Sequence, residues 1–413
     1  MIKFLFLIVY IFSNLWEIFL NYLNLKYAKN RGRDVPDIFK DTIDENILKK
    51  SLNYLRDKTY FLNIEIFIKT LIFVLSMIYL FPFFEKLSMN LIYKNELANF
   101  SFYQSLIFFS LLGIFILLTD LPFDIYFTFK LEKIYGFSNI TKKVYIIDKI
   151  KIIIISILIG IPLLYIFILI LHKFKFFFLP LSFIIIFFIL ITNIIYPSLI
   201  LPLFYKFEKL EDDSLKNKIL KITEKEDLKF ENIYIINAST RSSHTNAFFS
   251  GLGKTKKIVF YDTLIKNRTE NEILSIFAHE LGHYKKGHIF KSFLLTSIFT
   301  IFILLLFNIL YYSKISTPFY SCNLCIDLKI IYTGIFLSSI VFPIEFLINT
   351  ISRKFEFESD EFAMKLTDKN SIIKSLKNIF RENLSNLFPH PLYSKFKYSH
   401  PPPLERILHI LNL

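Results

Sequence analysis

The segment His279-Glu280-Leu281-Gly282-His283 stands shortly before an apolar stretch, residues 289–312, that is long enough to cross a membrane. On an α-helix, residues four positions apart lie on one face, so the imidazoles of His279 and His283 can bind the same metal ion. Glu280 lies one residue further round, where it can accept a proton from water at that ion. This pattern predicts a hydrolytic zinc site at the membrane-proximal start of a spanning helix.

The composition around this segment is that of a membrane protein. The chain of 413 residues is 54% hydrophobic, contains 50 Phe and has a mean hydropathy of +0.47. Seven apolar stretches each have the roughly 20 residues that cross a hydrocarbon layer about 30 Å thick. Because a soluble core does not need such stretches, we expect an all-α polytopic membrane protein. The predicted spans are residues 3–25, 61–85, 101–128, 149–172, 176–200, 289–312 and 331–351.

Basic residues in the loops predict how the spans are oriented, since Lys and Arg favour the cytoplasmic side. Nine basic residues lie between positions 26 and 60, two between 86 and 100, and four between 129 and 148. This alternation predicts a lumenal N-terminus and a cytosolic C-terminus. The net charge of +14 then reflects topology and attraction to anionic membrane lipid. We expect no nucleic-acid partner, because no basic helix, RNA-binding motif or zinc finger accompanies the charge.

These spans divide the chain into four predicted parts. Residues 1–200 hold spans one to five with short loops, and residues 201–288 form a cytosolic loop with a β-element and the start of the zinc-binding helix. Residues 289–351 hold spans six and seven. Residues 352–413 form a cytosolic helical segment that completes the active site.

Cys322 and Cys325 are the two cysteines of the chain, and both fall in the predicted lumenal loop between spans six and seven. A structural zinc site needs four ligands, so one Cys-x-x-Cys pair is weak support for a metal. A lumenal disulfide and two free thiols are both compatible with this position.

The loop of about residues 201–270 is the first substantial polar region. Its opening, Leu210 to Lys229, has the pattern of a charged amphipathic helix, and strand-like runs follow. An exposed strand edge can bind an extended peptide through main-chain hydrogen bonds, and we expect Asn246 and Ala247 on that edge. An ordinary hairpin without a ligand is the alternative. The runs are residues 232–237, 245–250 and 257–261, and the turn 251–254 joins the last two.

The start of the metal-binding helix is marked by Thr269-Glu270-Asn271-Glu272, a capping-box signature. The helix is expected to begin near residue 270 and to run through the histidine motif into the sixth span, to about residue 312. Gly282 and Gly287 are the positions where we expect a bend.

A catalytic zinc ion needs a third protein ligand, and candidates lie beyond the seventh span in residues 352–363. Glu356 and Asp360 are four residues apart and share a helix face. Glu356 could bind the metal, while Asp360 could accept the N–H of a ligating histidine. On spacing alone Glu358 and Glu361 compete for these roles, and a solvated acidic helix is a further possibility.

The stretch Tyr398-Ser399-His400-Pro401-Pro402-Pro403-Leu404-Glu405-Arg406 lies near the end of the chain. Its prolines predict an extended segment followed by a helix from about Leu404. His400 and Arg406 carry hydrogen-bond donors that could stabilise the oxyanion of a tetrahedral intermediate.

With these motifs the chain resembles the type I CAAX prenyl proteases, integral-membrane zinc metalloendopeptidases of the endoplasmic reticulum. The similarity extends from Leu121-Pro122-Phe123 to Arg406. The resemblance implies a seven-helix barrel around a large water-filled chamber, with a small cytosolic α+β portion that carries the active site. The most specific stretches are residues 241–247, 279–283, 353–363 and 398–406.

The resemblance also implies a role for each candidate site residue. It makes His279, His283 and Glu356 the ligands of one Zn²⁺ per chain, Glu280 the general base, and Asp360 the partner of a ligand. Asn246 matches the asparagine of the substrate-binding strand, and His400 and Arg406 match the groups that stabilise the transition state. Glu358 departs from the family, whose members commonly have glutamine there, and adds a negative charge beside the site.

The implied reaction is removal of the three C-terminal residues from farnesylated or geranylgeranylated CaaX proteins. A broader zinc protease of membrane quality control is the second hypothesis. A seven-span transporter or receptor with a structural zinc site is the non-enzymatic one, and Glu280 speaks against it because a structural site needs no base.

Overall fold

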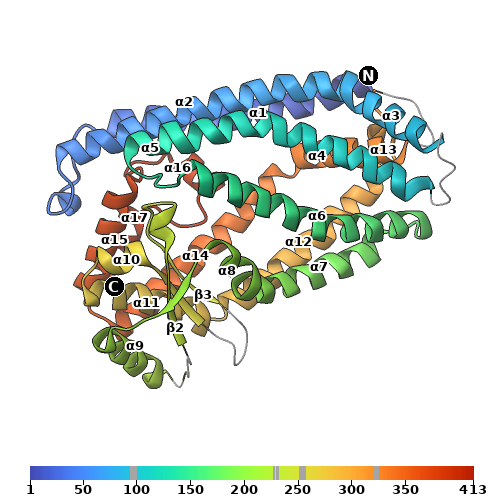
Figure 1. Ribbon diagram of the computed structural model, residues 1–413. Coiled ribbons are helices and arrows are strands. Elements are labelled where there is room, and N and C mark those ends of the chain that lie inside the picture. Colours follow the sequence, from blue (N-terminus) through green and yellow to red (C-terminus); the bar gives the residue numbers. More distant parts are fainter. Residues whose placement is uncertain (94–99, 227, 229–231, 251–256, 320–324) are drawn as a thin grey trace.

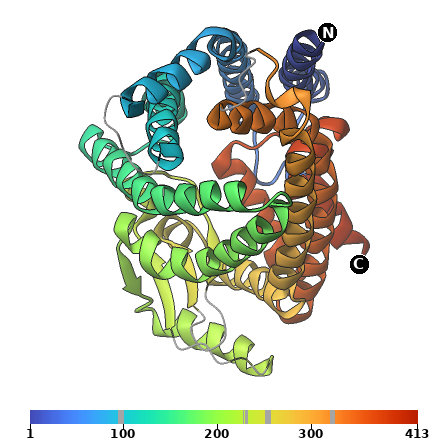
Figure 2. The same cartoon turned by 90° about the vertical axis from the view of Figure 1, so that its right-hand side faces the viewer.

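The computed structural model describes residues 1–93, 100–226, 228, 232–250, 257–319 and 325–413. Figure 1 shows long helices that run along one direction, with the sheet strands, α9 and α11 gathered at one end of the molecule, near the C-terminus. The N-terminus lies at the opposite end. In the perpendicular view of Figure 2 the long helices form a ring.

Six helical segments in the described part of the chain are long and apolar enough to cross a membrane. The prediction of a mainly helical, polytopic membrane protein is therefore confirmed. The segments are α1 (Ile2–Arg31); α2 (Glu45–Leu75), η2 (Ser76–Leu80) and α3 (Phe81–Tyr93); α4 (Phe100–Tyr126), η3 (Phe127–Leu131) and α5 (Glu132–Tyr135); α6 (Lys142–Lys173); α7 (Phe178–Ile195), η4 (Tyr196–Ile200) and α8 (Leu201–Phe204); and α12 (His288–Tyr311).

The seventh predicted span, residues 331–351, is a bent pair of helices rather than one continuous helix. α13 (Ile326–Ile340) and α14 (Phe342–Leu366) meet at an angle of 54°. Pro343 is the second residue of α14, and its ring together with its missing N–H opposes a continuous helix through this position. Counting the bent pair as one span gives up to seven.

The described residues include only part of the predicted cysteine loop. Cys325 directly precedes α13, is 1% exposed and is disulfide-bonded. Cys322 lies outside the described residues, as does the predicted turn at residues 251–254.

A four-stranded sheet with the order β1-β2-β4-β3 lies next to the metal-binding helix. β2 and β4 are parallel, and the other two pairs are antiparallel, so β3 is an edge strand. The three predicted strands are confirmed, whereas β1 was not predicted because its three residues carry no apolar run. The strands are β1 (Phe207–Lys209), β2 (Asn232–Ile236), β3 (Ala247–Ser250) and β4 (Lys257–Tyr261).

Two amphipathic helices cover one face of the sheet. α9 (Asp213–Lys225), the predicted amphipathic helix, buries Leu215 and Ile219. Beside α9 on the same face, α11 (Glu270–Lys285) buries Phe277 in the cluster that also contains Phe260 of β4. The short α10 (Asp262–Lys266) follows β4. This apolar core holds the edge strand β3 against the helix that carries the histidine motif.

The metal-binding helix begins where the capping box predicted. The Thr269 hydroxyl oxygen accepts a hydrogen bond from the Glu272 N–H at 3.4 Å, and the first residue of α11 is Glu270. The helix does not continue to residue 312, because Gly287 adopts a φ of +67° and separates α11 from α12. Only glycine takes this left-handed conformation without strain, so the predicted bend at Gly287 is confirmed.

Gly282 has a different role from the predicted bend. A β-carbon at this position would lie 3.0 Å from the Ser359 Cα, which shows that α11 and α14 pack backbone against backbone there. The prediction of a bend at Gly282 was wrong: this glycine permits the close approach of the two helices that carry the candidate metal ligands.

The C-terminal helices complete this end of the molecule. Ile407 and Ile410 pack in one buried cluster with Ala278 of α11 and Ala363 of α14. α17 starts at Pro403, one residue from the predicted start, which places Arg406 in its first turn. The helices are α15 (Lys369–Asn383), α16 (Pro391–Lys397) and α17 (Pro403–Asn412).

Candidate active site

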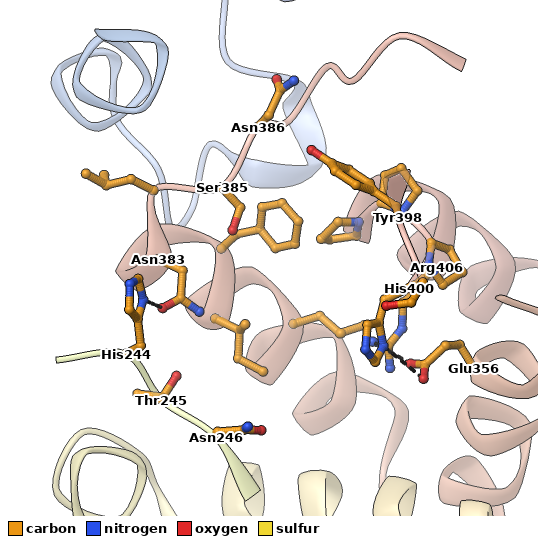
Figure 3. A pocket seen from close by; sticks show the side chains of 18 of the residues that line it. His244, Thr245, Asn246, Glu356, Asn383, Ser385, Asn386, Tyr398, His400 and Arg406 are labelled. Carbon is orange, nitrogen blue, oxygen red and sulfur yellow. Dashed lines mark hydrogen bonds and ion pairs between the residues drawn. The ribbon is translucent and has the colours of Figure 1, made fainter. Parts of the chain in front are cut away.

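A cavity of about 850 Å³ lies where the long helices meet the sheet and the C-terminal helices (Figure 3). Its walls come from α1, α2, α11, α14 and α15, from the residues leading into β3, and from the segment before α17. Most of the predicted site residues line it: Asn246, Ala247, His279, Glu280, Glu356, Asp360, His400 and Arg406.

His279 and His283 of α11 and Glu356 of α14 form a compact group of metal-ligand type. Their ligand atoms all lie within 4.8 Å of one another. The two Nε2 atoms are 3.3 Å apart, the His279 Nε2 is 3.3 Å from Glu356 Oε2, and the His283 Nε2 is 3.2 Å from Glu356 Oε1. Ligands at the usual bond lengths around a tetrahedral zinc ion are about 3.3 Å apart.

The Glu356 carboxylate gives a second reason to assign a cation to this group. Glu356 is only 2% exposed, and its Oε2 has no hydrogen-bond partner among the described residues. The Arg406 Nη1 lies 3.3 Å from this oxygen, and a buried carboxylate oxygen without a hydrogen bond is costly unless a cation satisfies it. The residues present therefore fit a single metal ion held by two imidazoles and a carboxylate.

Asp360 and Arg406 orient His279. The Nδ1–H of His279 donates to Asp360 Oδ1 at 2.8 Å, which leaves its Nε2 to face Glu356 and His283. Arg406 in turn donates from Nε to Asp360 Oδ2 at 2.8 Å and from Nη2 to Oδ1 at 2.6 Å. Asp360 is fully buried, and this bidentate ion pair compensates its charge.

Glu280 and His400 lie beside the metal-ligand group. Glu280 is half-buried on the cavity wall, and its burial raises the pKa of the carboxyl group, an effect that His279 and His283 oppose. His400 comes from the extended segment before α17, and its Nδ1 is 2.9 Å from Glu356 Oε1. Figure 3 shows His400, Arg406 and Glu356 together at one side of the cavity.

The structure separates the three competing glutamates of α14. Glu356 lies beside the two histidines of α11. The Oε2 of Glu358 is 3.1 Å from the His288 Nε2, and the Oε1 of Glu361 is 3.1 Å from the His409 Nε2. Spacing alone left these residues equivalent, because the direction of approach of α11 is not encoded in α14.

His288 contacts His283, and the sequence did not predict this contact. Its Nδ1 lies 3.1 Å from the Nδ1 of His283, and its ring stacks on Phe355 at a centroid distance of 4.3 Å. On a continuous helix a five-residue offset turns His288 away from His283. The break at Gly287 turns His288 back toward His283. This glycine is the sequence feature from which the contact could have been predicted.

Asn246 and Ala247 lie where the chain enters the edge strand β3. The Asn246 carbonyl accepts a hydrogen bond from the Tyr261 N–H at 3.0 Å, and its side-chain oxygen accepts one from the Ala247 N–H at 2.9 Å. Since main-chain groups alternate in direction along a strand, the carbonyl of Ala247 points away from β4. The free edge of β3 therefore faces outward from the sheet at this position.

The chain resembles known proteins over nearly its whole length. The family model described as Peptidase family M48 matches residues 209–413, and the one described as CAAX prenyl protease N-terminal, five membrane helices, matches residues 24–206. CAAX prenyl protease 1 of Saccharomyces cerevisiae is 32% identical, covering 94% of this chain and 91% of that protein.

Two further proteins are similar to this chain over most of its length. The CAAX prenyl protease 1 homolog of Homo sapiens is 30% identical and covers 95% of this chain and 92% of that protein. The crystal structure of S. mikatae Ste24p matches with a TM-score of 0.92 and 30% identity, over 99% of both chains.

Proposed function

The chain belongs to the CAAX prenyl protease 1 family of membrane metalloproteases, and we propose that it is a zinc-dependent endopeptidase that removes the three C-terminal residues (-aaX) from farnesylated or geranylgeranylated CaaX proteins. The observation that carries the zinc assignment is the clustering of two histidine nitrogens and one buried carboxylate within 4.8 Å on the cavity wall. Glu280 on the same wall supplies the base that hydrolysis requires.

His279, His283 and Glu356 would hold one Zn²⁺ per chain. When bound, zinc would polarise the scissile carbonyl and activate water for attack. Glu280 accepts a proton from the attacking water and passes it to the leaving amine, as a general base and then a general acid. Asp360, held by Arg406, keeps the Nε2 of His279 available to the metal.

The remaining predicted residues act on the substrate. His400 and Arg406 donate hydrogen bonds to the oxyanion of the tetrahedral intermediate. Asn246 and Ala247 bind the substrate main chain along the free edge of β3. Arg406 would stabilise the oxyanion in addition to forming its ion pairs, since its Nη1 is also 3.3 Å from Glu356 Oε2.

The proposed setting is the endoplasmic reticulum membrane, with the N-terminus lumenal and the C-terminus cytosolic. The apolar helices provide a surface for the prenyl chain. The binding free energy of such a chain to apolar helices or lipid grows with the number of methylene groups that it buries. In this proposal the four parts of the chain that the sequence predicted keep their roles, with residues 201–288 and 352–413 building the site on the cytosolic side.

The test is cleavage of one peptide in two forms by the purified protein in detergent. A farnesylated CaaX peptide is expected to lose its last three residues, as mapped by mass spectrometry, whereas the same peptide without the lipid is cleaved much more slowly. Equal cleavage of both forms would favour the broader quality-control protease. The absence of any cleavage by the zinc-loaded enzyme would refute the proposal.

A further inference from the structure

A second group of charged residues lines the cavity away from the metal-ligand group. His244 precedes β3, its Nδ1 lies 2.7 Å from the Asn383 side-chain oxygen, and its Nε2 lies 3.5 Å from Glu132 Oε2. Both ring nitrogens thus face acceptors, and the hydrogen bond to Glu132 raises the pKa of His244. In Figure 3, His244 and Asn383 lie at one side of the cavity and His400, Arg406 and Glu356 at the other.

Glu132 is already paired through both of its oxygens. The Tyr54 hydroxyl donates to Glu132 Oε1 at 2.6 Å, and His244 approaches Oε2. Glu132 is 9% exposed, so these two groups satisfy the carboxylate in a buried position. Its negative charge faces His244 directly and interacts with Lys58 through space.

Lys58 of α2 stands beside this group without an ion pair of its own. It lines the cavity, and its Nζ lies 5.4 Å from the centre of the Tyr54 ring and 5.8 Å from that of Phe127. Within the described ranges, no carboxylate comes within 4.0 Å of this ammonium group. This side of the cavity therefore presents an ammonium group that has no direct ion pair with a carboxylate of the described residues.

The segment that leads into β3 connects the two sides of the cavity. His244, Thr245, Asn246 and Ala247 all line it. Ala247 belongs to the same buried cluster as Phe277 of α11, so this end of the segment lies against the helix that carries Glu280. The other end, His244, contacts Glu132 and Asn383.

A peptide added antiparallel to this segment runs from Ala247 toward His244 in its own N-to-C direction. Three residues in extended conformation cover about 10 Å, the same three-residue step that separates Ala247 from His244. A peptide cut beside Ala247 that ends three residues later would thus place its terminal carboxylate at the His244 end of the cavity, where Lys58 stands.

We propose that Lys58 binds the C-terminal carboxylate of the substrate, while the contacts of Glu132 with Tyr54 and His244 leave Lys58 without a direct ion pair. This inference rests on the proposed function and adds to it the group that recognises the free end of the chain. An ammonium–carboxylate hydrogen bond is stronger than a neutral one, which gives the enzyme a way to fix the distance from the chain end to the cut.

The test compares a farnesylated CaaX peptide that has a free C-terminal carboxylate with the same peptide as a C-terminal amide. A hydrogen bond to a charged group predicts that wild type favours the acid in kcat/KM by about 10- to 100-fold. In Lys58→Gln this preference is expected to fall to near one. Lys58→Arg keeps the charge and is expected to restore most of it.

Lys50→Gln is the matched control, because Lys50 lies on the same helix and is exposed, and it is expected to keep the wild-type preference. Equilibrium binding of the labelled acid and amide to Glu280→Gln measures the same ratio without turnover. Equal cleavage of acid and amide by wild type, or an undiminished preference in zinc-loaded Lys58→Gln, would overturn the inference. If wild type cleaves neither peptide, the proposed function itself fails.

Discussion

The two sides of the cavity are built in different ways. The metal side takes the candidate ligands His279, His283 and Glu356 from two helices that touch at Gly282: the histidines are four residues apart on α11, and Glu356 lies across that contact on α14. The other side takes Lys58 from α2, Glu132 from α5, His244 from a loop and Asn383 from α15. Holding an ion requires rigid, closely spaced ligands, whereas recognising a chain end requires only one well-placed charge.

The largest expected effect is on the metal side, from a pair of glutamates on the same helix. Glu356→Ala is expected to reduce bound zinc from one per chain to almost none and to abolish cleavage, because it removes a buried ligand. Glu358→Ala is the matched control and should retain the metal, since the Glu358 carboxylate contacts His288 instead. Metal analysis of the purified variants measures both, and zinc loss in the Glu358 variant alone would reverse the assignment.

The Glu280→Gln variant is expected to retain zinc but to lose most of its catalytic activity. Removing a general base lowers kcat by about 10²- to 10⁴-fold, while the amide preserves the size of the side chain. Single-turnover cleavage of the farnesylated peptide gives the rate, and metal analysis gives the zinc content. A variant as fast as wild type would show that another group accepts the proton.

Asp360→Asn is expected to have a smaller effect on the same side. The amide can no longer pair with Arg406 as an anion, so His279 is held less firmly and zinc affinity should fall by about 10- to 100-fold. Competition with a chelator of known affinity measures the dissociation constant. An unchanged constant would mean that Asp360 contributes only to packing.

On the opposite side, the smallest effect is a pH-dependent change in stability. Because Glu132 raises the pKa of His244, their pair stabilises the fold fully below the unfolded histidine pKa, about 6.5, and is lost as pH rises through the higher folded value. Lys58, the other charged group near His244, opposes the shift. His244→Gln should lower Tm by about 1–2 °C at pH 6, and by less at pH 9.

The control for this measurement is Lys50→Gln, whose Tm difference from wild type should not vary with pH. Thermal unfolding is followed in detergent at both pH values. A His244→Gln difference that is larger at pH 9 than at pH 6 would contradict the sign of the pKa shift.

The same contrast explains what could be predicted from the sequence. Apolar length predicted the spans, the capping box predicted the start of α11, and the four-residue spacing brought His279 and His283 together, because each of these signals is local. The choice of Glu356 from three glutamates rests on how α11 crosses α14. The way these helices cross follows from their tertiary packing at Gly282, and no local sequence pattern predicts that packing.

The elements that prediction missed depend on long-range placement or on one backbone angle. The seventh span bends between Ile340 and Phe342 inside an apolar stretch, where hydropathy is continuous. His288 returns to His283 only through the positive φ of Gly287. Lys58 was assigned to a basic loop by its charge, and only the fold shows that it lines the cavity.

The left-handed turn at Gly287 also has a mechanical consequence. Spanning helices adapt to bilayers of different thickness by changing their tilt. Because α12 starts anew after Gly287, a change in its tilt can be absorbed by rotation at a single glycine instead of passing along a rigid rod into α11. The helix that carries the histidine motif is therefore joined to the spanning helix through one flexible residue, and His288 of α12 contacts His283 of the motif across this joint.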